Sequence, residues 1–216
     1  TGRDTLVGTQ LRLKRKNRHH QSAALFAHFR GVERRPGSDQ GNISIYRFEH
    51  GWVWLIPLRD GITSIGAVCW PDYLKQRQGD QRDFLMQTLL AIPALSQRLE
   101  QAEMVGNLHA TGNYTYACTQ MSGPRWVMAG DSYAFVDPIF SSGVYLAMHG
   151  AEVAADFVDG TLRNPTRERS LQRGYERQVA RGLNTLSWFI YRFTTPAMRK
   201  LFAEPRNDLQ LEQAMI

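Results

Sequence analysis

The sequence predicts an α+β fold: an antiparallel β-sheet domain, the C-terminal part of an α/β domain, and C-terminal helices. Three observations support this prediction. Short segments of apolar and β-branched residues, separated by turn residues, lie between residues 23 and 68. A strand-like segment at 125–129 leads through a polar turn into a helix rich in small residues. Residues 165–202 show mostly helical spacing.

The composition indicates a globular protein. The chain has 216 residues, 43% of them apolar, which is enough for one large domain or two small ones. The apolar runs fall short of the ~18 residues that a membrane span needs, and no signal-peptide pattern opens the chain. We therefore expect a cytoplasmic protein. The two cysteines, Cys69 and Cys118, lack metal-ligand spacing, so we expect them to be reduced and structural, with no metal site.

The predicted sheet begins with strands at 23–31, 42–48, 52–58 and 62–68. Asp60-Gly61 lies between the last two, and this pair strongly favours a tight hairpin because glycine accepts a positive φ. We expect these strands to form a meander.

Helices and further strands follow the meander. Gly79-Asp80 is a predicted cap for a helix over 84–99, with Pro93 as a break or kink. Segments 113–120 and 125–129 are predicted strands, joined by a turn at 122–124.

A helix is predicted over 141–158, with Gly160 placed to end it, and its small residues indicate close packing. The helical region from 165 to 202 carries arginines at four-residue intervals, which are typical of a solvated face rather than a nucleic-acid surface. These are Arg169, Arg173, Arg177 and Arg181.

The net charge of +6, from 26 basic and 20 acidic residues, is compatible with acidic surfaces or anionic ligands and selects neither. The basic run at 11–20 lacks the interleaved aromatic residues and glycines of RNA-binding segments, so we expect a solvated or anion-facing loop and no nucleic-acid partner.

The segment at 130–148, GDSYAFVDPIFSSGVYLAM, combines a carboxylate with the start of a helix. The first N–H groups of a helix have no intrahelical partner, and they form the positive end of the helix dipole. We expect Ser141, Ser142 and Gly143 to open this helix next to Asp131, and a polar ligand to bind there. The alternatives are an Asp131 that caps the following turn and an ordinary helix N-cap.

Two segments carry a resemblance to a known family. Residues 130–132 and 137–144 together resemble the last flavin-binding motif of FAD-dependent halogenases and related monooxygenases. Residues 52–57, WVWLIP, match the WxWxIP signature of flavin-dependent halogenases. The opening Thr1-Gly2-Arg3 looks like the end of the D-A-[ST]-G-R segment of these enzymes. The resemblance, tryptophan-halogenase-like, covers essentially the whole chain.

The resemblance implies that FAD is the cofactor. Asp131 would hold the ribityl chain, and the helix start would face the pyrimidine edge of the isoalloxazine, where related enzymes also bind halide. Gly143 would let the flavin ring approach the backbone. The implied cofactor-binding residues are Gly130, Asp131, Pro138, Ser141, Ser142, Gly143 and Val144.

Residues 52–57 allow two interpretations. Trp52, Trp54 and Ile56 share one face of a strand and are followed by Pro57. Aromatic strand faces usually belong to the core or cover a sheet. The resemblance instead implies that these residues partition the flavin from the organic substrate.

The chain contains no GxGxxG and no GxxxxGK[ST] segment, and it begins without methionine. We therefore expect a C-terminal portion whose GxGxxG half lies upstream, together with the lysine that captures hypohalous acid in the family. No catalytic residue is assigned; the lysines at 14, 16, 75 and 200 are not candidates. Phe140 stands where tryptophan halogenases carry a glutamate, as in halogenases of phenols and pyrroles.

The expected organisation assigns 1–23 to the end of an FAD-binding segment, 24–119 to the sheet or substrate domain, 120–160 to an FAD-binding strand, loop and helix, and 161–216 to a helical region. We expect a halogenase-like FAD-dependent oxidoreductase fragment, inactive in isolation, that acts on an electron-rich aromatic or related small molecule. Halide and a flavin reductase are the implied partners. The alternatives are a flavin-dependent hydroxylase or dehydrogenase on the same scaffold, and a noncatalytic basic binding protein.

Overall fold

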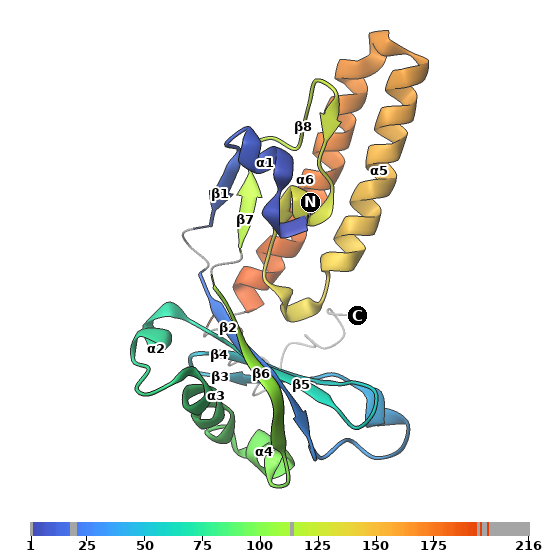
Figure 1. Ribbon diagram of the computed structural model, residues 1–216. Helices are drawn as coiled ribbons and strands as arrows, with labels where there is room; N and C mark the ends of the chain where they lie inside the picture. The colour runs from blue at the N-terminus through green and yellow to red at the C-terminus, as the bar shows by residue number, and fades with distance from the viewer. Residues whose placement is uncertain (1, 18–20, 113–114, 194, 196–197, 199–216) are drawn as a thin grey trace, which may run out of the picture. The chain divides into compact units, whose positions relative to one another are not determined.

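The computed structural model describes residues 2–17, 21–112, 115–193, 195 and 198. The chain divides into two compact units, one formed by Arg18–Tyr114 and the other by Thr1–Asn17 together with Thr115–Ile216. The predicted α+β class is confirmed, since one unit is built on an antiparallel sheet and the other ends in long helices (Figure 1). The sheet unit thus spans 18–114, whereas the sequence predicted 24–119.

The sheet unit contains a five-stranded antiparallel sheet of order β3-β4-β5-β2-β6. All four predicted strands are present, but only the last three form a meander. The first predicted strand pairs with the last one instead of with the second. The strand β6 was not predicted. The strands are β2 (Ala23–Arg30), β3 (Ser44–Phe48), β4 (Gly51–Pro57), β5 (Thr63–Cys69) and β6 (Glu103–Gly112).

The hairpin between β4 and β5 has the predicted turn. Asp60 and Gly61 have φ values of 56° and 71°, both in the left-handed region that a type I′ turn requires at its two central positions. Beyond the turn, Leu55 of β4 is paired with Ile65 of β5.

The core of this unit lies between the sheet and the helices α2 (Pro71–Lys75), α3 (Gln81–Leu90) and α4 (Pro93–Ser96). Val53, Leu55 and Ile65 are fully buried in the same cluster as Leu85 and Leu89. Burial of each such side chain contributes about 1.5–3 kcal/mol.

The predicted cap and break of the helical segment are both confirmed. The Asp80 side chain accepts a hydrogen bond of 2.8 Å from the Asp83 N–H at the start of α3. Pro93 opens the separate helix α4, because a proline fits the first helical position but not a helix interior.

The second unit contains a three-stranded sheet of order β1-β7-β10, made of β1 (Lys14–Lys16), β7 (Tyr116–Cys118) and β10 (Ala134–Phe135). The prediction of a loop over 11–20 is wrong at 14–16, which form an edge strand; residues 18–20 lie outside the described part. Residues 14–16 pair antiparallel with β7, and the Lys14 ammonium lies 4.0 Å from the Tyr116 ring centroid and donates to the Arg3 carbonyl at 2.7 Å. Charged side chains are common on edge strands.

The predicted turn at 122–124 is also wrong. Ser122–Gly123 forms the strand β8 and pairs with β9 (Trp126–Val127), so the turn lies at 124–125, where Arg125 has a φ of 65°. The Trp126 indole covers Gly123, where an added Cβ would lie 2.6 Å from the ring. The glycine is therefore required for packing within the hairpin.

The helices α5 (Gly143–Arg163) and α6 (Glu168–Phe193) lie side by side and are joined by a turn at Pro165–Arg167 (Figure 1). The prediction that Gly160 ends the first helix is wrong, because α5 continues to Arg163. A Cβ on Gly160 would lie 3.0 Å from a Leu171 methyl carbon, so this glycine lets the two helices approach. The predicted close packing is confirmed.

The helix α6 carries the predicted arginines, and all of them are exposed: Arg169, Arg173, Arg177 and Arg181. The inner face packs Tyr175 against Phe157, with ring centroids 5.7 Å apart, and the Tyr175 hydroxyl donates to the Met128 carbonyl at 2.6 Å. α6 ends at Phe193, and residues 199–202 of the predicted helix lie outside the described residues.

Candidate functional site

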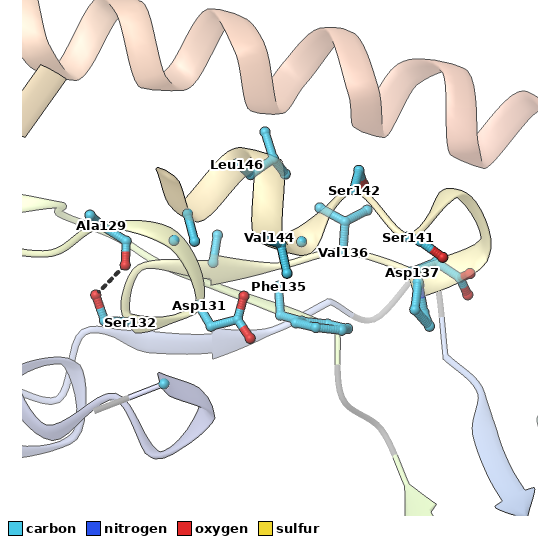
Figure 2. Close-up of a pocket in the computed structure, with 16 residues that line it drawn as sticks. Ala129, Asp131, Ser132, Phe135, Val136, Asp137, Ser141, Ser142, Val144 and Leu146 are labelled. Carbon is cyan, nitrogen blue, oxygen red and sulfur yellow. Dashed lines mark hydrogen bonds between the residues drawn. The ribbon is translucent and has the colours of Figure 1, made fainter. Parts of the chain in front are cut away.

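A cavity of about 540 Å³ lies in the second unit, at the start of α5. Its walls are the turn Gly130–Ser132, strand β10, the turn Pro138–Phe140 and the first residues of α5 (Figure 2). Every residue that the resemblance assigned to cofactor binding lines this one cavity: Gly130, Asp131, Pro138, Ser141, Ser142, Gly143 and Val144. Gly2 lines it as well.

Small residues hold the turn at Gly130–Ser132 against α5. Gly130 has a φ of 56°, and a Cβ there would lie 2.7 Å from the Cβ of Ala147. Gly150, one turn further along α5, is buried beside Ala129. The small-residue pattern of this helix therefore positions the turn that carries Asp131.

The Asp131 carboxylate is partly buried and makes no hydrogen bond or ion pair within the described part of the chain. Figure 2 shows it beside Phe135 in the cavity wall. Burial raises the pKa of Asp131, and the Arg3 guanidinium opposes that rise. The Tyr116 hydroxyl donates to the backbone carbonyl of Asp131, which anchors the residue through its main chain.

The alternative in which Asp131 caps the following turn is not what the structure shows, because the side chain that caps the turn Pro138–Phe140 is that of Asp137. Asp137 has this role instead: its carboxylate is buried and accepts a hydrogen bond of 3.0 Å from the Ile139 N–H. The two aspartates of the motif therefore differ in function, one structural and one turned to the cavity.

The start of α5 offers donors without acceptors. Ser141 has a φ of 51°, and Ser142 precedes the helix with no side-chain capping bond. Because the first N–H groups of a helix have no intrahelical partners, this end of α5 favours an anion or a carbonyl oxygen. The ordinary side-chain N-cap that we considered is absent here.

The cavity fits a flavin. Gly143 lines it, and a Cβ built on Gly143 meets no atom within 4 Å, so the backbone there is open to a flat ring. A carboxylate that accepts from hydroxyl groups and a helix start that donates N–H groups lie in the same wall. The volume falls within the range of about 300–1,000 Å³ that is usual for ligand pockets.

The WxWxIP residues lie on β4 in the sheet unit. Val53 and Leu55 point into the core, while Trp52 and Trp54 lie on the other face, with ring centroids 5.9 Å apart. Trp54 lies over Gly66, where an added Cβ would be 2.2 Å from its ring.

The row of aromatic rings continues on this face of the sheet. The centroid of the Phe26 ring lies 5.7 Å from that of Trp54 and 5.2 Å from that of His109, on which Phe26 stacks. Ile56 and Pro57 are partly buried on the same strand. The role of these residues as a partition stays a prediction.

Sequence reasoning missed several residues of the cavity wall. Asp137 belongs to the quoted motif but was not predicted as a cofactor-binding residue. A single aspartate among apolar neighbours gave no separate indication of a site. The others are apolar or small and resemble core residues in a single sequence: Phe135, Val136, Leu146 and Ala147. Among the described residues, no cluster of potential metal ligands occurs. Likewise, no described helix is both long and apolar enough to cross a bilayer.

Comparison with known proteins identifies the family of the chain. The model of the tryptophan halogenase family matches residues 35–201, and the chain belongs to that family. The chain is 32% identical over 193 residues to the flavin-dependent halogenase gsfI of Penicillium aethiopicum, covering 84% of this chain and 36% of gsfI. It is 28% identical to the 1H-pyrrole-2-carbonyl-[peptidyl-carrier protein] chlorinase of Pseudomonas fluorescens, covering 100% of this chain and 50% of that protein.

Solved structures agree with the sequence matches. A triple mutant of the flavin-dependent brominase Bmp2 superposes with a TM-score of 0.80 at 27% identity and covers 89% of this chain and 50% of the brominase. The chondrochloren halogenase CndH gives a TM-score of 0.77 at 27% identity, covering 91% of this chain and 51% of CndH. The chain thus spans between about a third and a half of the length of these relatives.

Proposed function

We propose that the full-length protein is a flavin-dependent halogenase that acts on an electron-rich aromatic small molecule, and that this chain supplies the wall for the flavin. The observation that carries the proposal is the convergence of all the predicted cofactor residues, from Gly130 to Val144, on one cavity. The named relatives, which are flavin-dependent halogenases, support it.

The residues of the cavity would divide the work of holding FAD. The Asp131 carboxylate accepts hydrogen bonds from ribityl hydroxyl groups. The N–H groups at Gly143 and Val144 donate to the pyrimidine edge of the ring, where the helix dipole stabilises negative charge. When bound, FAD supplies the oxygen-activating redox chemistry of the family.

The same helix start gives a place for halide, because unpaired N–H groups and the positive end of a dipole favour a small anion. Trp52, Trp54, Ile56 and Pro57 would keep the organic substrate away from the flavin. With the substrate kept apart in this way, halide would be the species exposed to the two-electron oxidation that reduced FAD and oxygen supply. A flavin reductase is the partner that renews the reduced cofactor.

The proposed location is a reducing cytoplasm, with which the free cysteines Cys69 and Cys118 agree.

The reaction type is tested by supplying the full-length protein with reduced FAD, oxygen, bromide and a panel of electron-rich phenols, pyrroles and indoles. We expect brominated products by mass spectrometry, and none when bromide is omitted. Hydroxylated or desaturated products formed equally well without halide contradict the proposal and favour the hydroxylase or dehydrogenase alternative. Failure of the full-length protein to bind flavin favours the noncatalytic alternative.

A further inference from the structure

The strand β7 lies beside the wall of the flavin cavity and joins segments from both ends of the chain. It pairs with β10 on one side and with β1 on the other. Tyr116 of β7 is paired with Phe135 of β10, a residue of the cavity wall, so the two side chains share one face of this sheet. Tyr116 itself is 4% exposed and does not line the cavity. It is therefore close to the wall but out of reach of a ligand.

The Tyr116 hydroxyl contacts the turn that carries Asp131. It donates a hydrogen bond to the Asp131 backbone carbonyl. Burial raises the pKa of Tyr116, and the charge of Asp131 raises it further, so the phenol keeps the proton that it donates. Because this bond holds the main chain of Asp131, it restricts where the carboxylate in the cavity wall can lie.

The Tyr116 ring makes a second contact, on a different segment of the wall. The Lys14 ammonium lies 4.0 Å from the ring centroid, a cation–π geometry, and the same ammonium donates to the Arg3 carbonyl at 2.7 Å. Arg3 belongs to the turn Gly2–Asp4, and Gly2 lines the cavity. The ring therefore holds this turn through Lys14.

One side chain thus connects two segments of the cavity wall that are far apart in the sequence. Gly2 and Asp131 both line the cavity, and the turns that carry them are both tied to Tyr116. A cavity binds its ligand more tightly when its walls are ordered beforehand, because ordering them during binding costs free energy.

We propose that Tyr116 is a positioning residue for the flavin: its hydroxyl holds the turn of Asp131, and its ring, through Lys14, holds the turn of Gly2. The inference rests on the proposed FAD site, and it adds two residues that affect flavin binding without contacting the flavin.

Tyr116→Phe tests the hydroxyl, because it keeps the ring and its contact with Lys14. We expect the FAD affinity of the full-length protein to fall about three- to tenfold in a flavin fluorescence titration. Tyr175→Phe is the matched control, since the Tyr175 hydroxyl is also buried and donates to the Met128 carbonyl at 2.6 Å, outside the cavity wall. It should lower the melting temperature as Tyr116→Phe does, but leave FAD affinity within about twofold.

A double-mutant cycle separates positioning from a general structural effect. Asp131→Ala keeps the backbone carbonyl and removes the carboxylate that Tyr116 positions. In that background, Tyr116→Phe should weaken FAD binding by less than about twofold, because the hydroxyl acts through the carboxylate. A merely structural role would give the same loss in both backgrounds.

Lys14→Met tests the contact on the ring, because it removes the ammonium at similar side-chain length. The amides of Gly2–Asp4 should exchange faster in this variant of the full-length protein without FAD, and FAD should bind about threefold more weakly. Lys14→Arg keeps a cation that stacks on the ring and donates, so it should restore both properties. Lys16→Met, an equal change of charge at an exposed position of the same strand, should change neither.

The inference is overturned if the wild-type protein binds no FAD, if Tyr116→Phe and Tyr175→Phe change FAD affinity alike, if the effects of Tyr116→Phe and Asp131→Ala are additive, or if Lys14→Met behaves like Lys16→Met. None of these measurements uses turnover. Brominated products together with an unchanged FAD affinity in Tyr116→Phe contradict only this inference. FAD binding that depends on Tyr116, without halide-dependent products, contradicts only the halogenase proposal.

Discussion

Gly143→Leu in the full-length protein is expected to abolish FAD binding while the protein stays folded. Gly143 is the first residue of α5 and lines the flavin cavity, and no atom lies within 4 Å of its Cβ position. A leucine there fills space that the isoalloxazine needs without touching the packed core. We expect an affinity loss of about a hundredfold or more, measured by flavin fluorescence titration.

The controls separate occlusion of the cavity from loss of structure. Gly174→Leu makes the same exchange on α6 away from the cavity and should leave FAD affinity unchanged. Gly130→Ala should instead lower the melting temperature, because its Cβ would meet Ala147 and its φ of 56° disfavours other residues. Wild-type FAD affinity in Gly143→Leu would place the flavin elsewhere.

Asp131→Ala is expected to weaken FAD binding by about tenfold to a hundredfold, because it removes a charge-assisted hydrogen bond worth about 1.5–3 kcal/mol. The Asp131 carboxylate lines the cavity and has no hydrogen-bond partner among the described residues. We therefore expect the ribityl hydroxyl groups of the flavin to donate hydrogen bonds to it. Unchanged affinity in a folded variant would assign Asp131 a role outside cofactor binding.

The pKa of Asp131 gives this prediction a second readout. Burial raises the pKa of the folded-state carboxyl, so the folded form holds its proton more tightly than the unfolded form. Stability without flavin should therefore fall as the pH rises from the unfolded pKa through the folded pKa. Asp131→Asn should remove this dependence and match or exceed the wild-type melting temperature at pH 7. Asp137→Asn, which weakens a buried capping bond, should lower it.

The sheet shows which strands a single sequence reveals. β2, β4 and β5 were predicted because buried β-branched and apolar residues recur along them, and the Asp60-Gly61 turn fixed one hairpin. β6 was missed because most of its side chains are exposed or partly exposed and because Gly106, with a φ of 74°, interrupts it. Its pairing with β2 shifts register between Phe26 and His28, so no simple alternation exists to be detected.

Glycine explains most of the local errors. Gly160 and Gly123 were interpreted as signals that end an element, yet both sit inside one and make room for Leu171 and Trp126. The two roles of glycine are indistinguishable until the neighbouring side chain is known, and that neighbour comes from the fold rather than from the local sequence.

The flavin cavity is the part of the site that the sequence predicts best. Apart from Gly2, the residues that line the cavity are close in the chain, from Ala129 to Ala147, and the contact between Gly130 and Ala147 brings the motif together.

Amide hydrogen exchange of the full-length protein with and without FAD tests the central claim most directly. If the residues around Asp131 and the start of α5 hold the flavin, peptides that cover 129–147 should exchange more slowly when FAD is bound, and Gly143→Leu should remove that protection. Peptides from the outer end of the helical hairpin, around 160–172, should not change. Protection by FAD that spares 129–147 would contradict the assignment of this cavity to the flavin.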